Sequence, residues 1–199
     1  MIQLRRISAL ILGAWLGAGI LADVAVTQNF QTIDRFLESP GDRATSVLLN
    51  QAGRARERVI LRRNAGEENN WIFLNWERVE LVMGSGLFLL LLFGERPQKI
   101  ILAGAIVLLL IVAFEHFLLT PQITAMGRTV DNLPANSRDV KTFWLLHGFY
   151  SGLDILKILI SLAMAARLAI RRKRDKDAFA REYEMSMGAA RKPMGDRRG

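Results

Sequence analysis

Four long apolar blocks, separated by charged segments, limit what this chain can fold into. They cover residues 7–26, 71–94, 100–119 and 143–170. A helix rises about 1.5 Å per residue, so roughly 20 residues cross a hydrocarbon core of about 30 Å. Helices of a soluble protein need a polar face toward water, whereas these blocks are apolar almost all round. The sequence therefore predicts an all-α polytopic membrane protein with four transmembrane helices in a bundle.

The composition excludes several other classes of protein. Because 51% of the residues are hydrophobic, the chain is not a disordered tail. It has no cysteine, so neither a disulfide scaffold nor a cysteine-ligated zinc or iron–sulfur site can form. It also lacks the G-x-G-x-x-G, P-loop, G-x-S-x-G and H-E-x-x-H motifs. We therefore expect a non-enzymatic protein.

The first block has an alternative interpretation as a cleaved signal peptide. The basic pair Arg5-Arg6 followed by an apolar run fits such a peptide. Against it, the run is longer than a typical signal sequence and no clean A-x-A cleavage site follows. Helical spacing also continues beyond the block through Val26, Phe30 and Ile33, which favours a retained transmembrane helix.

The distribution of lysine and arginine predicts the orientation, because short basic segments stay in the cytoplasm. The N-terminus, the turn 95–99 and the tail 171–199 are all basic, and four crossings place them on one side. We expect both termini in the cytoplasm of a bacterium, with the domain 1–170 in the inner membrane. The basic tail also has affinity for anionic lipids. It contains no recognisable nucleic-acid-binding module, so it does not indicate nucleic-acid binding.

The segment 27–70 is predicted to lie outside and to be largely helical. Ser39-Pro40 is typical of a helix start, and Asn64-Ala65-Gly66 of a helix stop. Apolar positions between them recur at spacings of four, three and four residues, at Leu48, Ala52, Ala55 and Val59. This pattern predicts an extramembrane amphipathic helix near the outer surface. It serves either as a solvated connector or in docking on anionic headgroups or a protein partner.

Polar residues inside the blocks are costly in a membrane and often functional. Those that we single out are Glu77, Arg78, Glu80, Glu115, His116, His147, Ser151, Asp154 and Lys157. The predicted topology places most of them toward the outer side, while the inner halves of the blocks are almost purely aliphatic. The sequence therefore predicts an outward-facing polar cluster within the membrane.

A structural role for this cluster begins with the fourth block. His147, Ser151, Asp154 and Lys157 follow one another at spacings of four, three and three, so they share one helix face. Asp154 and Lys157 are placed to form an i, i+3 ion pair, which Glu80 or Arg78 could complete. The cluster would then support structure, assembly or the binding of a membrane-protein partner.

The alternative is a small transporter, or a protein that binds a cation, a metal or haem. Neutral imidazoles and carboxylates are suitable metal ligands. A metal or haem site would need His116 and His147 to meet across helices, for a metal with Glu80 or Glu115 as well. As neighbours, Glu115 and His116 should point about 100° apart, so we expect that both cannot face inward squarely.

Small residues follow one face of the first block. Gly13 and Gly17 form a G-x-x-x-G motif, preceded by Ala9. Such motifs let two helices approach closely. We expect packing within the bundle, with homodimerisation as the alternative.

Several short stretches resemble a known family. They are Gly13-Ala14-Trp15-Leu16-Gly17, Asn75-Trp76-Glu77, Thr120-Pro121-Gln122-Ile123, Met126-Gly127-Arg128 and FWLLHGFYSGLDILK at 143–157. Together they resemble small bacterial membrane proteins with a DUF4149-type domain of unknown function, related to a eukaryotic four-span TMEM family. The resemblance implies a four-helix membrane domain over about 7–170 and brings no established reaction. It does not account for the basic tail or the arginine-rich external segment.

Overall fold

The computed structural model describes residues 2–39, 41, 45–47, 50, 53–93, 99–130, 133–134 and 136–190. Every regular element in these ranges is helical, which confirms the all-α prediction. The elements are α1 (Ile2–Glu38), α3 (Arg54–Leu92), α4 (Lys99–Phe114), η1 (Glu115–Leu119), α5 (Thr120–Val130) and α6 (Arg138–Ala190). A short helical piece at 45–47 lies between α1 and α3.

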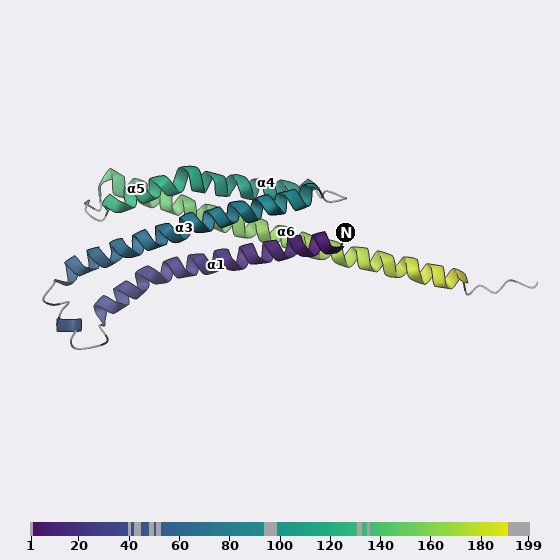
Figure 1. Cartoon of the computed structure of the whole chain (residues 1–199), viewed down its shortest axis with the longest axis horizontal. Helices are drawn as coiled ribbons and strands as arrows, with labels where there is room; N and C mark the ends of the chain where they lie inside the picture. Colours follow the sequence, from purple (N-terminus) through teal and green to yellow (C-terminus); the bar gives the residue numbers. More distant parts are fainter. Residues whose placement is uncertain are drawn as a thin grey trace, which may run out of the picture.

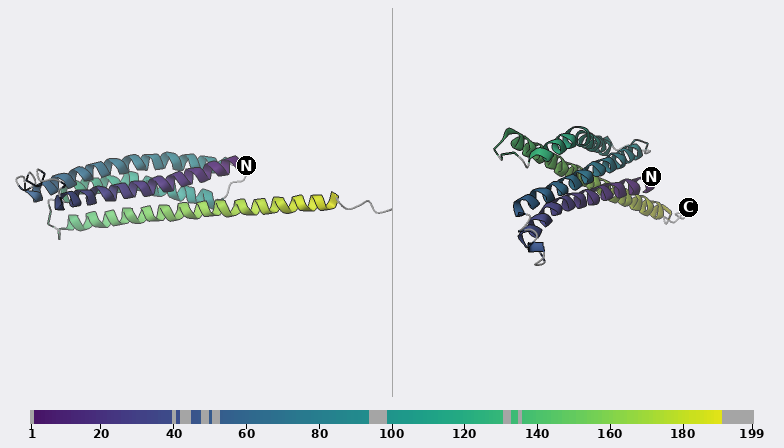
Figure 2. Two further views of the ribbon diagram at one scale, coloured as in Figure 1. Left: turned by 90° about the horizontal axis from the view of Figure 1, so that it is seen from below. Right: turned by 60° about the vertical axis from the view of Figure 1, so that its left-hand side comes forward.

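The helices form four long rods. α1 and α3 run side by side in opposite directions, and α4, η1 and α5 continue one another as a third rod (Figure 1). α6 is the fourth rod and packs against α1, α4 and α5. Its C-terminal part extends alone beyond the other helices, as both views in Figure 2 show. Each predicted apolar block lies on a different rod.

One apolar core joins all four rods. Its buried members are Leu12, Trp15, Leu87, Ile101, Ala105, Leu108, Val112, Met164 and Leu168. They come from α1, α3, α4 and α6, in the half of the molecule near the N-terminus (Figure 1). The most apolar parts of the four rods therefore lie at the same level.

Two helical stretches are long and apolar enough to cross a membrane, Arg6–Glu38 and Lys99–Val130. Only 17% and 28% of their most apolar windows are buried within the protein. Large apolar side chains therefore point outward, among them Leu10 and Leu110, which are 72% and 65% exposed. Charged side chains occupy the interior instead, where Glu77 and Glu115 have no exposed surface at all.

The segment between the first two blocks differs from its prediction. α1 continues to Glu38, and α3 already begins at Arg54, so much of the segment extends these two rods instead of forming a separate helix. Ion pairs hold the extensions together, with Asp34 2.8 Å from Arg58 and 3.5 Å from Arg62. Nearer the core, Asn69 Nδ2 donates to the carbonyl oxygen of Val26 at 3.2 Å.

The predicted helix stop at Asn64-Ala65-Gly66 was wrong, because α3 passes through it without a break. A glycine within a helix costs only about 1 kcal/mol, and burial of Ala65, which is 4% exposed, opposes that cost. Of the predicted apolar stripe, only Val59 has a described side chain, and it is 45% exposed. Pro40 of the predicted start lies outside the described residues.

The third rod widens at η1. Thr120 N–H donates to the carbonyl oxygen of Glu115, five residues back, which is the bonding pattern of a π-helix. Pro121 follows at once, and a proline ring clashes with the carbonyl four residues earlier in a regular helix. A wider turn relieves that clash. Consequently the rod does not end at the predicted boundary of 119 but continues to Val130.

Candidate functional site

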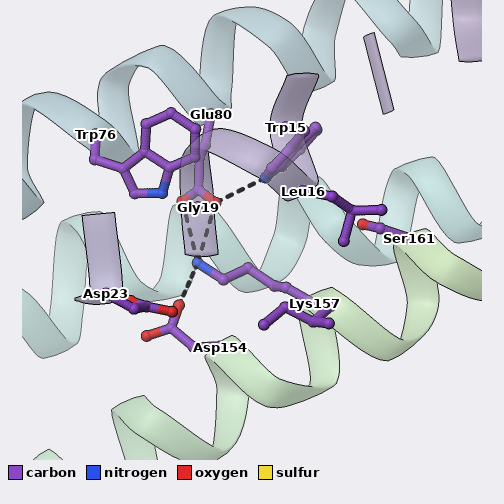
Figure 3. Close-up of a pocket in the computed structure, with 10 residues that line it drawn as sticks. Trp15, Leu16, Gly19, Asp23, Trp76, Glu80, Asp154, Lys157 and Ser161 are labelled. Carbon is purple, nitrogen blue, oxygen red and sulfur yellow. Dashed lines mark hydrogen bonds and ion pairs between the residues drawn. The ribbon is translucent and has the colours of Figure 1, made fainter. Parts of the chain in front are cut away.

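Lys157 lies at the centre of a buried ion network. Its Nζ is 2.7 Å from Glu115 Oε2 on η1, 2.8 Å from Asp154 Oδ1 on its own helix and 3.1 Å from Glu80 Oε2 on α3. Lys157, Glu80 and Glu115 are all buried, and Figure 3 shows the contacts to Glu80 and Asp154. This network joins three of the four rods.

Trp15 adds the remaining rod to the network. Its indole Nε1–H donates to Glu80 Oε1 at 2.7 Å, so this carboxylate accepts hydrogen bonds from α1 and α6 at once (Figure 3). Trp15 is also a member of the apolar core. The ion network therefore sits directly on that core.

A small cavity of about 20 Å³ lies beside Lys157. Asp23, Glu80 and Asp154 line it, and Asp23 reaches it from α1 (Figure 3). A space of this size holds about one water molecule. Its carboxylates and Lys157 make the cavity a suitable site for a water molecule or a small ion.

The cluster around Lys157 contains more acids than bases. Asp23, Glu80, Glu115 and Asp154 surround a single ammonium group. Among the described residues, Glu115 Oε1 has no hydrogen-bond partner although it is buried. Uncompensated charge is expensive away from water. The arrangement therefore has capacity for added protons or a cation.

A second buried network surrounds Glu77, one turn before Glu80 on α3. Glu77 Oε1 accepts hydrogen bonds from Tyr150 OH at 3.0 Å and from the hydroxyl of Thr120. His116 Nδ1 lies 2.9 Å from Glu77 Oε2. Three donors can satisfy a buried carboxylate without a paired lysine or arginine. This network joins α3, η1, α5 and α6.

The ion network around Lys157 lies deeper than predicted. Trp15 and Lys157 are within two residues of the middle of the blocks 7–26 and 143–170. Glu80 and Glu115 contact these residues, so both lie level with the middle of those blocks. For Glu115 the reason is that the third rod continues past its apolar block through α5, so a residue near the end of that block lies at the middle of the rod.

Three predicted members of the cluster lie outside both networks: Arg78, Ser151 and His147, which is described below with the other histidine. Arg78 is exposed and contacts Asn75 at 3.5 Å, because it lies on a different face of α3 from Glu77 and Glu80. Ser151 is also exposed, and its hydroxyl donates to the carbonyl oxygen of His147. Neither residue can complete the ion network.

The inward face of α6 explains the position of Ser151. Its inward positions recur at spacings of four, three, four, three and four, at Tyr150, Asp154, Lys157, Ser161, Met164 and Leu168. Ser151 is one position, or about 100°, away from Tyr150 on this helix. The same spacing was the signal that would have identified Tyr150, which sequence reasoning missed along with Trp15 and Thr120.

The expectation that Glu115 and His116 cannot both face inward was wrong. Both side chains reach inward, but they do so toward different neighbours. Glu115 contacts Lys157 on α6, whereas His116 contacts Glu77 on α3. A rod packed between two partners has two inward directions, so adjacent residues about 100° apart can each use one.

The predicted packing glycines do not pack within the chain. Gly13 and Gly17 are exposed, and a Cβ atom at either position would meet nothing within 4 Å. Close approaches occur elsewhere: a Cβ at Gly84 would lie 2.9 Å from the Trp15 ring, and one at Gly104 would lie 2.7 Å from Met164 Sδ. The rotation of α1 directs Trp15 inward and leaves the G-x-x-x-G motif outside.

The two histidines lie in different surroundings. His116 belongs to the Glu77 network, while His147 stacks on Phe143 with ring centroids 5.9 Å apart. His147 lines a larger cavity of about 330 Å³ near the ends of α1 and α5. Within the described ranges, no group of three or more His, Asp or Glu residues is arranged to hold a metal ion.

No family model, curated protein or solved structure matches this chain. The two networks and the exposed apolar surface therefore provide the indications of function.

Proposed function

We propose that this chain is a non-enzymatic integral membrane protein whose buried polar networks hold four transmembrane helices together. The observation that supports this most directly is its inverted distribution of polarity. Glu77, Glu80, Glu115 and Lys157 are buried, while large aliphatic side chains cover the outside of the same rods. An aliphatic surface of this kind is favourable in contact with lipid and unfavourable in contact with water.

The shared core supports four crossings rather than two. Leu87 of α3 and Met164 of α6 pack in the same core as Leu12 and Leu108, which belong to the two most apolar helices. If those two helices cross the membrane, α3 and α6 lie at the same depth beside them. Glu77, Glu80 and Lys157 of these two helices are buried, which lowers the cost of placing the helices in lipid.

Cysteine labelling distinguishes four spans from two, because the chain has no cysteine of its own. We place single cysteines at Gly41, Asn136 and Glu182, all exposed positions, and treat cells with a membrane-impermeant maleimide. With both termini cytoplasmic, four spans predict labelling of Gly41→Cys and Asn136→Cys from outside. Glu182→Cys should react only after permeabilisation.

Asn136→Cys is the decisive variant. If only Arg6–Glu38 and Lys99–Val130 crossed the membrane, residue 136 would lie in the cytoplasm and would be protected. Labelling of Glu182→Cys in intact cells would instead contradict the proposed orientation. Release of the protein from membranes by alkaline carbonate would contradict integral insertion altogether.

Assembly is the role that the networks support within this membrane protein. Helices in lipid gain little from the hydrophobic effect, so packing and interhelical polar contacts hold them together. Gly13 and Gly17 lie on the outer surface, which leaves homodimerisation as their proposed use. The basic tail is proposed to contact anionic lipids on the cytoplasmic side. Kinship with the DUF4149-type family rests on the short motifs alone.

Proton or monovalent-cation binding is a second candidate function. Four carboxyl groups surround Lys157, and one water-sized cavity lies between Asp23 and Asp154. The core residues Leu12, Leu87 and Met164 lie on the side of the cluster toward the N-terminus of α1, so apolar packing covers the cluster on that side. We therefore propose that a proton or cation reaches the cluster from one side only, which is typical of a binding site and not of a channel.

Infrared spectroscopy tests this second candidate. A protonated carboxylic acid has a carbonyl stretch that is separate from the carboxylate bands. We expect such a band in the wild type at neutral pH, and its loss in Glu115→Gln. If sodium chloride, but not choline chloride, removes the band, the site exchanges a proton for a sodium ion. Absence of any acid band in both salts would refute proton storage.

A further inference from the structure

The larger cavity lies apart from the ion network around Lys157. It has a volume of about 330 Å³ and is lined by α1, α3, α5 and α6, at the end of α1 away from the N-terminus. Binding sites for small molecules have volumes of roughly 300–1,000 Å³. This cavity is therefore large enough for a ligand of at least a dozen heavy atoms.

Aromatic side chains form much of its wall. Phe30, Phe73, Phe143 and Trp144 line it from three helices. The rings are fixed by contacts with one another and with neighbours; Phe143 lies 5.3 Å from Trp144 and Phe73 lies 5.4 Å from Tyr150, centroid to centroid. A wall of this kind accepts an alkyl chain or a flat apolar body.

Positive charge gathers on the same lining. Three arginines contribute to it against one glutamate. Arg128 is engaged with Glu67 through contacts of 2.9 and 3.1 Å, and Arg62 lies 3.5 Å from Asp34. Arg63 forms no ion pair or hydrogen bond with another described residue, although its charge also lowers the pKa of the Glu67 carboxyl. Its guanidinium is therefore available to an anion.

A further polar group lies on the wall contributed by α6. The ring nitrogens of His147 form no hydrogen bond with another described residue, although the ring is only partly exposed. It can orient a ligand whose headgroup offers oxygen atoms. The cavity thus combines an apolar wall with an unpaired cation and a neutral hydrogen-bonding group.

We propose that this cavity binds a single-chain amphiphile with an anionic headgroup. The alkyl chain lies between the aromatic walls of Phe73 and Phe143, and the carboxylate or phosphate contacts Arg63. The site does not depend on the role of the Lys157 network, since none of that network's ionisable residues lines it.

Tryptophan quenching by 12-bromododecanoate tests the proposal on the full chain in phosphatidylcholine nanodiscs at pH 8. Bromine quenches Trp144, and the Trp144→Phe variant identifies that part of the signal. We expect saturable quenching by the acid and at least about tenfold weaker binding of 12-bromododecanol, because the alcohol cannot pair with Arg63. Acetate should not compete.

Two pairs of variants keep the test specific. Gly66→Leu fills the cavity, because a Cβ at Gly66 would meet nothing within 4 Å, and should abolish the saturable phase. Gly86→Leu is its control on the same helix, equally free of clashes and outside the cavity. Arg63→Gln should remove the preference for the acid, whereas Arg56→Gln, two turns away, should keep it.

Each result decides the proposal. Equal binding of acid and alcohol would mean an apolar cavity only, and competition by acetate would mean an anion site only; either overturns it. Non-saturable quenching that Gly66→Leu leaves unchanged would reflect partition into lipid and also overturns it. With saturable binding established, competition by lysophosphatidylglycerol added to the nanodisc assigns the ligand to a single-chain membrane lipid. Lack of that competition assigns it to free single-chain acids.

Discussion

Replacing Lys157 with methionine should destabilise the protein strongly. The side chain is buried and contacts three carboxylates at 2.7, 2.8 and 3.1 Å. Removing one partner of a buried ion pair costs about 3–5 kcal/mol, since the remaining charge is left uncompensated. A folded protein is stable by only about 5–15 kcal/mol in total. Lys157→Met should therefore remove a large part of the stability.

The three carboxylates should not share this cost equally. Glu80 keeps its hydrogen bond from Trp15, and Asp154 has a side chain that is 18% exposed. Glu115 is fully buried and would keep no hydrogen bond, because its Oε2 is bonded to Lys157 and its Oε1 has no partner among the described residues. We therefore expect Glu115→Leu to offset about 2 kcal/mol of the loss in the double variant.

The assay is reversible unfolding in mixed micelles with an increasing fraction of sodium dodecyl sulfate, followed by circular dichroism. Arg78→Met is the matched control: it removes an exposed cation and should change the free energy of unfolding by less than about 1 kcal/mol. A loss of less than 1 kcal/mol in Lys157→Met would refute the reasoning. So would a double variant that is less stable than Lys157→Met alone.

Three further predictions follow from single contacts. Trp15→Phe removes the indole donor at 2.7 Å from a buried carboxylate and should cost about 1.5–3 kcal/mol in the same unfolding assay. Gly84→Ala should cost about 1–3 kcal/mol, because its Cβ would lie 2.9 Å from the Trp15 ring, while Gly13→Ala should not destabilise. The hydrogen bond from Arg128 holds the pKa of the Glu67 carboxyl below its usual range. This link between α3 and α5 is therefore present above the ordinary glutamate pKa and is lost as pH falls through the lowered value; Arg128→Gln should raise the Glu67 pKa toward about 4.3 in a carbon-13 NMR titration.

The polar residues show how far sequence reasoning reaches. Membership of an apolar block marks Glu80, Glu115 and Lys157 as unusual, because ionisable groups are rare in such surroundings. Which of them meet depends on helix rotation, and a difference of one residue changes the direction by about 100°. Arg78 and Ser151 were included in the cluster by the same criterion, and their faces turned out to point away from it.

The long connection between the first two blocks shows a different limit. Considered without its tertiary contacts, Gly66 indicates the end of a helix, and the charged residues before it indicate a separate helix outside the membrane. Contacts between distant residues decided otherwise, since Asp34 pairs with Arg58 and Asn69 bonds the backbone of Val26. Weak local signals of about 1 kcal/mol yield to such contacts.

The sequence by itself determined the helical class, the four rods and the level of the ionisable residues along each rod to within a few turns. These properties follow from hydrophobicity and helix propensity, which act on neighbouring residues. Only the tertiary structure decided that Lys157 binds Glu80 and Glu115, that His116 binds Glu77, and that Gly13 and Gly17 face outward. These outcomes depend on the rotation and register of packed helices and on the π-turn before Pro121, which arise from contacts between residues far apart in the chain.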